Sequence, residues 1–205
     1  MTNPWLNVPL EEYETHMAAV RQLSPLSDLF AEALLVRRPA SVAVLGVAGG
    51  NGLERIDRRI TRRVVGLDHN PQYLDAVRRR FADLEGLELH QMDLAQEMAP
   101  MPPVDLVHAA LIFEHAGLER CLENALALVA TDGALSVVLQ RSGTEEPKVG
   151  ASGIASMQEL KERFTLIDPL DLHRRLGESG LQPVWETQRQ LPGGKAFWMG
   201  IFLRA

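Results

Sequence analysis

Short apolar runs alternate with amphipathic segments along most of this chain. The runs begin at Val42 and then occupy residues 63–68, 87–92, 104–110, 134–140, about 183–190 and about 195–204. Their length and β-branched content are typical of buried strands. The segments between them place apolar residues at helical spacing, as with Leu74, Val77 and Phe81. Strands that alternate with helices predict an α/β fold with a doubly wound, seven-stranded and mostly parallel sheet.

Helix starts and turns support these boundaries. Asn70-Pro71 and Asp168-Pro169 each place an N-cap residue before a proline at the first helical position, and the second helix is expected to end near Gly180. A helix over residues 117–130 is expected to end in the turn residues 131–133, and residues 142–153 read as a long loop. The last two strands flank residues 191–194, so they must pair as a C-terminal antiparallel hairpin.

The region before the first strand predicts a helical cap. Residues 9–23 place Leu10, Tyr13, Met17 and Val20 on one helix face, and a second helix is expected from about Ser27. The chain has 205 residues, a length that fits a single domain. We therefore expect one domain over residues 1–205, with residues 1–40 as an N-terminal helical cap and residues 41–205 as the α/β core.

A glycine cluster follows the first strand, in the sequence Gly46-Val-Ala-Gly-Gly-Asn-Gly52. We expect it to form a tight turn that opens directly into a helix, where exposed backbone N–H groups suit an anionic or polar ligand. No Lys-Ser or Lys-Thr pair follows, which argues against a nucleoside-triphosphate loop. Arg55 stands where a dinucleotide fingerprint needs its third glycine. The turn therefore indicates a different small-molecule cofactor.

Acidic residues end the next two strands. Asp68 lies at the tip of the second strand, where a carboxylate can accept both hydroxyl protons of a ribose. Asp93 follows the third strand. Three successive strand ends thus carry a glycine turn, an acid and another acid.

This ordered set resembles the class I S-adenosylmethionine-dependent methyltransferases, with Ala48-x-Gly50-x-Gly52 as the counterpart of their first motif. Gly46 stands where the family usually has an acid, and Ala48 where it usually has a glycine. The resemblance covers roughly residues 42–205 and implies a Rossmann-like methyltransferase fold with S-adenosyl-L-methionine as cofactor. It also implies that Asp68 binds the ribose and Asp93 the adenine amino group. The cofactor-binding residues so implied are Ala48, Gly49, Gly50, Asn51, Asp68, His69, Met92, Asp93, Leu94 and Ala110.

Composition limits the partners. The net charge of −6 argues against a nucleic-acid substrate, and the arginines at 55–63 and 78–80 are expected to be solvated ends of helices. We expect neither a signal peptide nor a membrane span, and no metal site. The lone Cys121 favours a reducing compartment. The expectation is a cytoplasmic monomer or homodimer that binds a small-molecule acceptor.

Three residues are candidates for catalysis. His115 follows the fourth strand, and Tyr13 and His16 lie on adjoining surface of the first helix. The Asn/Asp-Pro-Pro-aromatic motif of enzymes that methylate nucleobase and glutamine amino groups is absent after the fourth strand. The sequence thus predicts methylation of oxygen, nitrogen or carbon on a small molecule. An aminopropyltransferase-like enzyme and a non-catalytic S-adenosylmethionine-binding regulator, the latter favoured by the missing acid at Gly46, are the alternatives.

Overall fold

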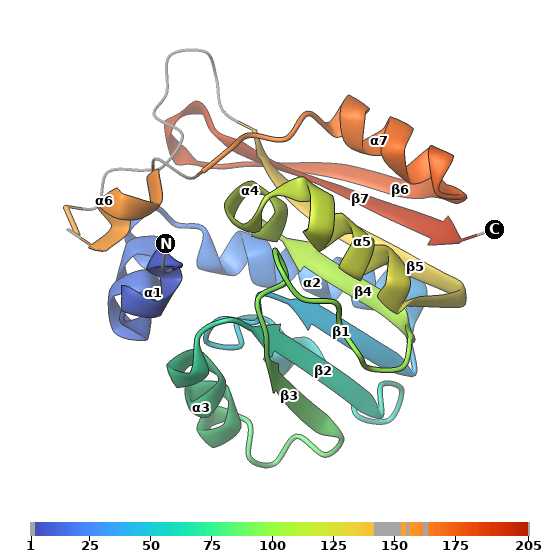
Figure 1. The fold of residues 1–205 in the computed structure, drawn as a ribbon, viewed down its shortest axis with the longest axis horizontal. Helices are drawn as coiled ribbons and strands as arrows, with labels where there is room; N and C mark the ends of the chain where they lie inside the picture. The colour runs from blue at the N-terminus through green and yellow to red at the C-terminus, as the bar shows by residue number, and fades with distance from the viewer. Residues whose placement is uncertain (1–2, 142–152, 155, 162–163, 205) are drawn as a thin grey trace.

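The structure is a computed structural model that describes residues 3–141, 153–154, 156–161 and 164–204. In this part of the chain, one seven-stranded sheet is flanked by helices on both faces (Figure 1). The loop predicted at residues 142–153 lies, apart from its last residue, outside the described residues.

The strands agree closely with the sequence pattern. They are β1 (Ser41–Leu45), β2 (Arg63–Asp68), β3 (Leu87–Gln91), β4 (Val104–Ala110), β5 (Val129–Arg141), β6 (Leu181–Gln190) and β7 (Ala196–Arg204). The helices are α1 (Leu10–Ala19), α2 (Leu23–Arg37), α3 (Pro71–Arg80), α4 (Ile112–Ala116), α5 (Leu118–Leu128), α6 (Ser156–Lys161) and α7 (Pro169–Glu178). Short 3₁₀ helices cover Pro4–Asn7 (η1), Leu53–Arg55 (η2) and Pro192–Gly194 (η3).

The strand order across the sheet is β3-β2-β1-β4-β5-β7-β6. Strands β1 to β5 pair in parallel, whereas β7 pairs antiparallel with both β5 and β6. The predicted fold class is therefore confirmed, including the C-terminal hairpin. From β1 the chain adds β2 and β3 on one side, and it then returns to add β4 and β5 on the other side. In α/β folds, ligands bind at the carboxyl ends of the two strands where the order changes in this way, here β1 and β4.

Alternate strand residues enter two separate hydrophobic layers. Leu45, Leu67 and Val107 face one layer together with residues of α5 and α7. Val42 and Val64 face the other layer with α2 and α3. Every strand at the centre of the sheet is thus buried on both faces, which explains why its sequence is a continuous apolar run.

One expected helix is absent. The glycine turn leads into the 3₁₀ turn η2 and further turns, and not into an α-helix. Glu54 accepts hydrogen bonds from the backbone N–H of Gly52 and the hydroxyl of Ser27. Asp57 accepts one from the backbone N–H of Arg59. These side chains satisfy backbone donors locally, and such bonds compete with helix formation.

Other boundaries also need correction. The first helix ends at Ala19 and the second begins at Leu23, four residues before the expected start at Ser27. The helix predicted over residues 117–130 ends at Leu128 because β5 already begins at Val129. Both predicted N-caps are confirmed, since the side chains of Asn70 and Asp168 accept backbone N–H groups of their helices.

The arginine clusters are mostly neutralised by neighbouring acids. Arg55 pairs with Asp28, and Arg63 pairs with Glu88. The cluster at residues 55–63 does not lie at a helix end, contrary to expectation, because that segment forms no α-helix. Residues 78–80 do form the last turn of α3. No helix within the described ranges is long and apolar enough to cross a membrane.

Candidate active site

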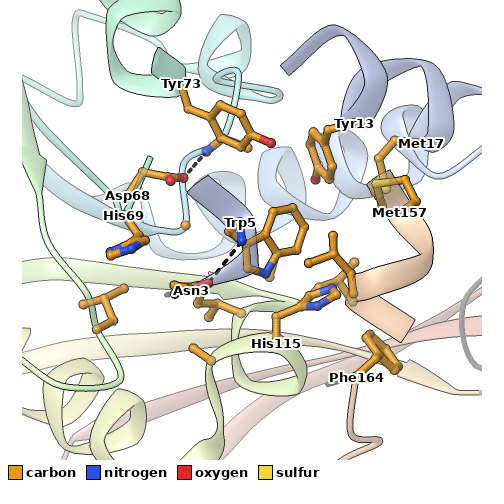
Figure 2. A pocket seen from close by; sticks show the side chains of 18 of the residues that line it. Asn3, Trp5, Tyr13, Met17, Asp68, His69, Tyr73, His115, Met157 and Phe164 are labelled. Atoms are coloured by element: carbon orange, nitrogen blue, oxygen red, sulfur yellow. Dashed lines mark hydrogen bonds between the residues drawn. The ribbon is translucent and has the colours of Figure 1, made fainter. Parts of the chain in front are cut away.

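A pocket lies at the carboxyl ends of the central strands, beneath the N-terminal segment (Figure 2). Its lining combines groups that follow β1, β2, β3, β4 and β5 with side chains from η1, α1 and α6. The lining residues are Asn3, Trp5, Tyr13, His16, Met17, Gln22, Gly46, Ala48, Asp68, His69, Tyr73, Asp93, Leu94, Ala110, Leu111, Ile112, His115, Ala116, Gln140, Met157, Leu160 and Phe164. The pocket therefore joins the strand ends implied by the sequence to the predicted cap.

The glycine turn after β1 explains why an acid is missing at Gly46. Gly46 has a φ of +71°, in the left-handed region that favours glycine. A Cβ atom built on it would lie 2.9 Å from the Cδ1 atom of Ile112. A carboxylate at this position would be strained and would collide with α4, so Gly46 is required by the backbone of the turn itself.

Asp68 holds the turn in place. One carboxylate oxygen accepts the backbone N–H of Ala48 at 2.8 Å, and the other accepts the backbone N–H of Asn70 at 2.9 Å. Burial raises the pKa of Asp68, while these backbone hydrogen bonds oppose that shift. An ionised carboxylate offers about four lone-pair positions, so two remain for hydroxyl donors from the pocket.

Asp93 is placed by its own loop. Its carboxylate accepts hydrogen bonds from the backbone N–H of Ala95 at 3.0 Å and from the side-chain amide of Gln96 at 2.8 Å. The Nδ1 atom of His69 lies 3.8 Å from the same carboxylate. The Nε2 atom of His69 is buried and has no hydrogen-bond partner among the described residues. An imidazole nitrogen buried without a partner at a pocket wall is available to a ligand.

The N-terminal segment is fastened to both sides of the pocket. Asn70 donates to the carbonyl oxygen of Trp5 at 2.9 Å. Glu14 forms an ion pair with Arg80, and Arg80 also donates to the carbonyl oxygen of Gly49 at 3.0 Å. A side chain at Gly49 would collide with this ion pair. The close approach of α1 to the turn therefore requires a glycine at this position.

His115 stands between two aromatic rings. Its ring centroid lies 4.9 Å from that of Trp5 and 4.9 Å from that of Phe164, and both contacts are edge-to-face (Figure 2). Burial, followed by the charge of the neighbouring His16, lowers the pKa of His115 to about 4. The imidazole is therefore neutral at physiological pH and able to accept a proton. Its Nδ1 atom has no hydrogen-bond partner within the described part of the chain.

Tyr13 has a different character. Its ring stacks on Tyr73 at a centroid distance of 6.1 Å and meets Trp5 edge-on at 5.7 Å. Burial, followed by the nearby charge of Asp68, raises the pKa of the Tyr13 phenol well above its usual range. Tyr13 therefore remains protonated and can donate a hydrogen bond, but cannot act as a base near neutral pH.

Glu114 lies immediately behind the pocket wall. It is 1% exposed, and its Oε1 atom accepts the backbone N–H of Gln140 at 2.8 Å. Its Oε2 atom has no partner among the described residues, and burial raises its pKa to about 8. The side chain of Gln140 reaches the pocket and accepts a hydrogen bond from Gln22 at 3.3 Å. The neutral form of Glu114 is thus part of the scaffold that fixes the end of β5.

Most of the sequence-predicted site residues meet in this pocket. Those that line it are Tyr13, His16, Ala48, Asp68, His69, Asp93, Leu94, Ala110 and His115. Gly49, Gly50, Asn51 and Met92 do not line it. Asn51 instead donates to the carbonyl oxygen of Leu23, and Met92 packs in the core.

The sequence analysis missed several lining residues. Met157, Leu160 and Phe164 come from α6 and the segment after it, which carry no motif. Gln22 and Gln140 also went unnoticed, because glutamines on a helix boundary and at a strand end are unremarkable in sequence. The one available signal for this half of the pocket was the cluster of aromatic residues near the N-terminus.

Comparisons with known proteins agree with this site. Residues 42–133, from β1 into β5, match a family model described as a methyltransferase domain. No curated protein sequence matched the chain. This match and the seven-stranded fold support a methyltransferase that uses S-adenosylmethionine as its cofactor, as the sequence resemblance implies.

Three solved structures illustrate the likeness of fold. The N-methyltransferase NodS from Bradyrhizobium japonicum WM9, in complex with S-adenosyl-L-homocysteine, has a TM-score of 0.68 and 14% identity, covering 89% of this chain and 87% of that one. Magnesium protoporphyrin IX methyltransferase from Synechocystis PCC 6803 has a TM-score of 0.66 and 13% identity, covering 91% and 85%. The [4+2]-cyclase SpnF has a TM-score of 0.66 and 12% identity, covering 88% and 80%. Because a cyclase shares the fold, the fold alone does not define the reaction.

Proposed function

We propose that this protein transfers the sulfonium methyl group of S-adenosylmethionine to a small-molecule acceptor, with His115 as the general base. The observation that carries the proposal is a single pocket containing both the strand-end groups of the cofactor site and a neutral, buried imidazole. Residues 1–40 act in this proposal as the cap that separates the acceptor from solvent.

The chain's own groups fit the cofactor. Asp68 has free acceptor positions for two ribose hydroxyls, and Asp93 with Leu94 lies where an adenine ring would sit. Gly46 and Ala48 line the pocket at the glycine turn, and Ala110 lines it at the end of β4. We assign Gly49, Gly50 and Asn51 the role of shaping the turn, and Met92 that of supporting the strand end from the core.

The sulfonium methyl is electrophilic, so the protein's main task is to align an acceptor with it. Correct alignment of two reactants contributes roughly 7–11 kcal/mol to lowering a barrier. Trp5, Tyr13 and Phe164 restrict the acceptor's position and exclude water. His115 takes a proton from the acceptor as the new bond forms, because an oxygen or nitrogen becomes strongly acidic once it is methylated. Tyr13 serves as a hydrogen-bond donor, and His16 tunes the charge near His115.

The two alternatives differ in what they require. An aminopropyltransferase binds a polyamine and needs carboxylates at the acceptor end. Here the acids that line the pocket, Asp68 and Asp93, follow β2 and β3 on the cofactor side, and Glu114 is not among the lining residues. A non-catalytic regulator would bind the cofactor and transfer nothing.

Two measurements test the proposal. Calorimetric titration should show that S-adenosylhomocysteine binds, whereas NAD and ATP at equal concentration do not. Incubation with S-adenosylmethionine labelled at the methyl group and a small-molecule extract should then give a labelled product. Binding of S-adenosylhomocysteine without any labelled product would favour the regulator. Recovery of the label in methylthioadenosine would favour the aminopropyltransferase, because transfer of the aminopropyl group leaves the labelled methyl on sulfur.

A further inference from the structure

The half of the pocket that faces away from the glycine turn is built from flat and apolar surfaces. His115 is held edge-on between Trp5 and Phe164. Met17, Met157 and Leu160 complete the wall and are each less than 5% exposed. Aromatic rings and methionine sulfur favour contact with another flat, polarisable molecule. We call this set, with His16, Gln22 and Gln140, the acceptor chamber.

The polar groups of the acceptor chamber are imidazoles and amides. His16 comes from α1, Gln22 from the junction between α1 and α2, and Gln140 from the end of β5. Gln22 donates to Gln140, which ties the cap to the sheet. Amides and imidazoles recognise hydroxyl, carbonyl and N–H groups by hydrogen bonding.

No arginine or lysine lines the pocket within the residues that the structure describes. Arg80, which lies against the glycine turn, is already paired with Glu14 and bonded to the carbonyl of Gly49. Among the described lining residues, a carboxylate or phosphate on the acceptor would therefore find no arginine or lysine to offset its desolvation, which is costly. This disfavours anionic acceptors.

A cationic acceptor finds no free carboxylate among the described residues that line the pocket. The lining carboxylates, Asp68 and Asp93, are engaged by backbone and amide donors on the cofactor side. Glu114 does not line the pocket. An acceptor ammonium would also lie near the positive sulfonium of the cofactor, and two like charges close together in a buried site repel.

We propose that the acceptor is an uncharged aromatic compound with a ring hydroxyl, bound in the acceptor chamber and methylated on that hydroxyl oxygen. This inference rests on the proposed function and adds the substrate class to it. The oxygen forms a bond to the methyl carbon while the carbon–sulfur bond breaks and leaves its electron pair on sulfur. The hydroxyl proton passes to His115 and then to solvent, so the products are an aryl methyl ether, S-adenosylhomocysteine and one proton.

A ring hydroxyl fits these groups better than an amine. With a pKa near 10, a phenol is neutral at physiological pH. Its proton becomes strongly acidic as the oxygen is methylated, so even a weakly basic imidazole can take it. Aliphatic amines are mostly protonated at that pH and would enter as cations. Trp5 and Phe164 line the chamber, so a flat aromatic ring can make aromatic contacts there.

The test uses the full chain, S-adenosylmethionine with a ¹³C-methyl group and a small-molecule extract fractionated by ion exchange at pH 7. The expected product passes through both anion and cation exchangers, partitions into an organic solvent and shows the ¹³C chemical shift of an aryl methyl ether. A labelled product retained on either exchanger, or a methyl carried on nitrogen or carbon, would overturn the inference while leaving methyl transfer intact. If no fraction is labelled, the proposed function and this inference fail together.

A matched phenol series gives a second readout. 4-Ethylphenol, tyramine and 4-hydroxyphenylacetate share one ring and differ in charge, and each is measured as a competitor of the labelling reaction. 4-Ethylphenol should inhibit labelling at a concentration at least tenfold lower than the two charged compounds, and equal or stronger inhibition by a charged one would contradict the assignment. Phe164→Ala should raise the KM for the acceptor at least tenfold and leave S-adenosylhomocysteine affinity unchanged. The control Trp185→Phe changes an exposed ring on β6, outside the pocket, and should alter neither value.

Discussion

The hydroxyl of Tyr73 donates a buried hydrogen bond of 3.0 Å to the carbonyl oxygen of Val8. Tyr73 belongs to α3, directly after the cofactor-side residues of β2, whereas Val8 lies between η1 and α1. The cap is therefore fixed by the same helix that begins beside Asp68. A change that loosens the cap should therefore also loosen the cofactor half of the pocket.

The first prediction concerns this bond. Tyr73→Phe removes one oxygen and leaves the carbonyl of Val8 buried without that donor, which costs about 1–3 kcal/mol. We expect a lower melting temperature and a higher KM for the acceptor, since the cap becomes less ordered. Urea denaturation and steady-state kinetics on the same sample measure both effects. Tyr13→Phe serves as the control, because its hydroxyl forms no hydrogen bond to any of the described residues. The same stability loss in both variants would refute the special role of Tyr73.

The second prediction concerns the ribose acid. Asp68→Ala should weaken S-adenosylhomocysteine binding at least tenfold, because hydrogen bonds to a charged acceptor contribute about 1.5–3 kcal/mol each. The control is Asp105→Ala. Asp105 binds Ser41 at the opposite end of the sheet, so its loss should reduce stability without changing affinity. Calorimetric titration measures the affinity of both variants for S-adenosylhomocysteine. If Asp68→Ala binds it as tightly as the unchanged protein does, Asp68 is not part of the cofactor site.

The core of the fold could be predicted from the sequence because each buried strand is a separate apolar run. Strand ends such as Asp68 and Asp93 were also visible, since an acid after an apolar run marks the edge of a sheet. The helix after Gly52 could not be excluded from its pattern. One reason is that Glu54 is held by a hydrogen bond from Ser27, a residue that only folding brings close.

The acceptor chamber was largely hidden for a similar reason. Phe164 and Met157 look like ordinary core residues in the sequence, and only the packing of α6 against the N-terminal segment brings them to His115. His115 itself was found because it follows β4. Its aromatic neighbours are separated from it by more than forty residues along the chain and leave no periodic signal.

The third prediction is a pH effect on stability caused by Glu114. Its pKa is about 8 in the folded protein and near its usual value when unfolded. Between these values the folded state holds one more proton, so the free energy of unfolding falls as pH rises, at most by about 1.4 kcal/mol per unit. Glu114→Gln keeps an oxygen that can accept the Gln140 N–H and should remove this slope.

The measurement is urea denaturation of both proteins from pH 6.5 to 8. The lowered pKa values of His108 and His115 have an effect of opposite sign, which fades as pH rises above about 6.5, the usual pKa of histidine. Both proteins share this effect, so the difference between their slopes reports Glu114. The exposed Glu85→Gln provides a control that should behave like the unchanged protein. A slope that persists in Glu114→Gln would show that Glu114 is ionised in the folded state.

The last prediction tests the general base. His115→Gln keeps a polar side chain of similar reach but cannot accept a proton, and general-base catalysis typically contributes 10²- to 10⁴-fold. We expect kcat to fall by about that factor while S-adenosylhomocysteine affinity is unchanged, because the ribose and adenine contacts lie elsewhere in the pocket. In the unchanged protein, a pKa of about 4 keeps the imidazole neutral, so kcat/KM should show no loss attributable to His115 as pH falls from 8 to 5.5. His16→Gln is the matched control on α1. If His16→Gln abolishes turnover and His115→Gln does not, the base is His16, and His115 serves only to position the rings of Trp5 and Phe164.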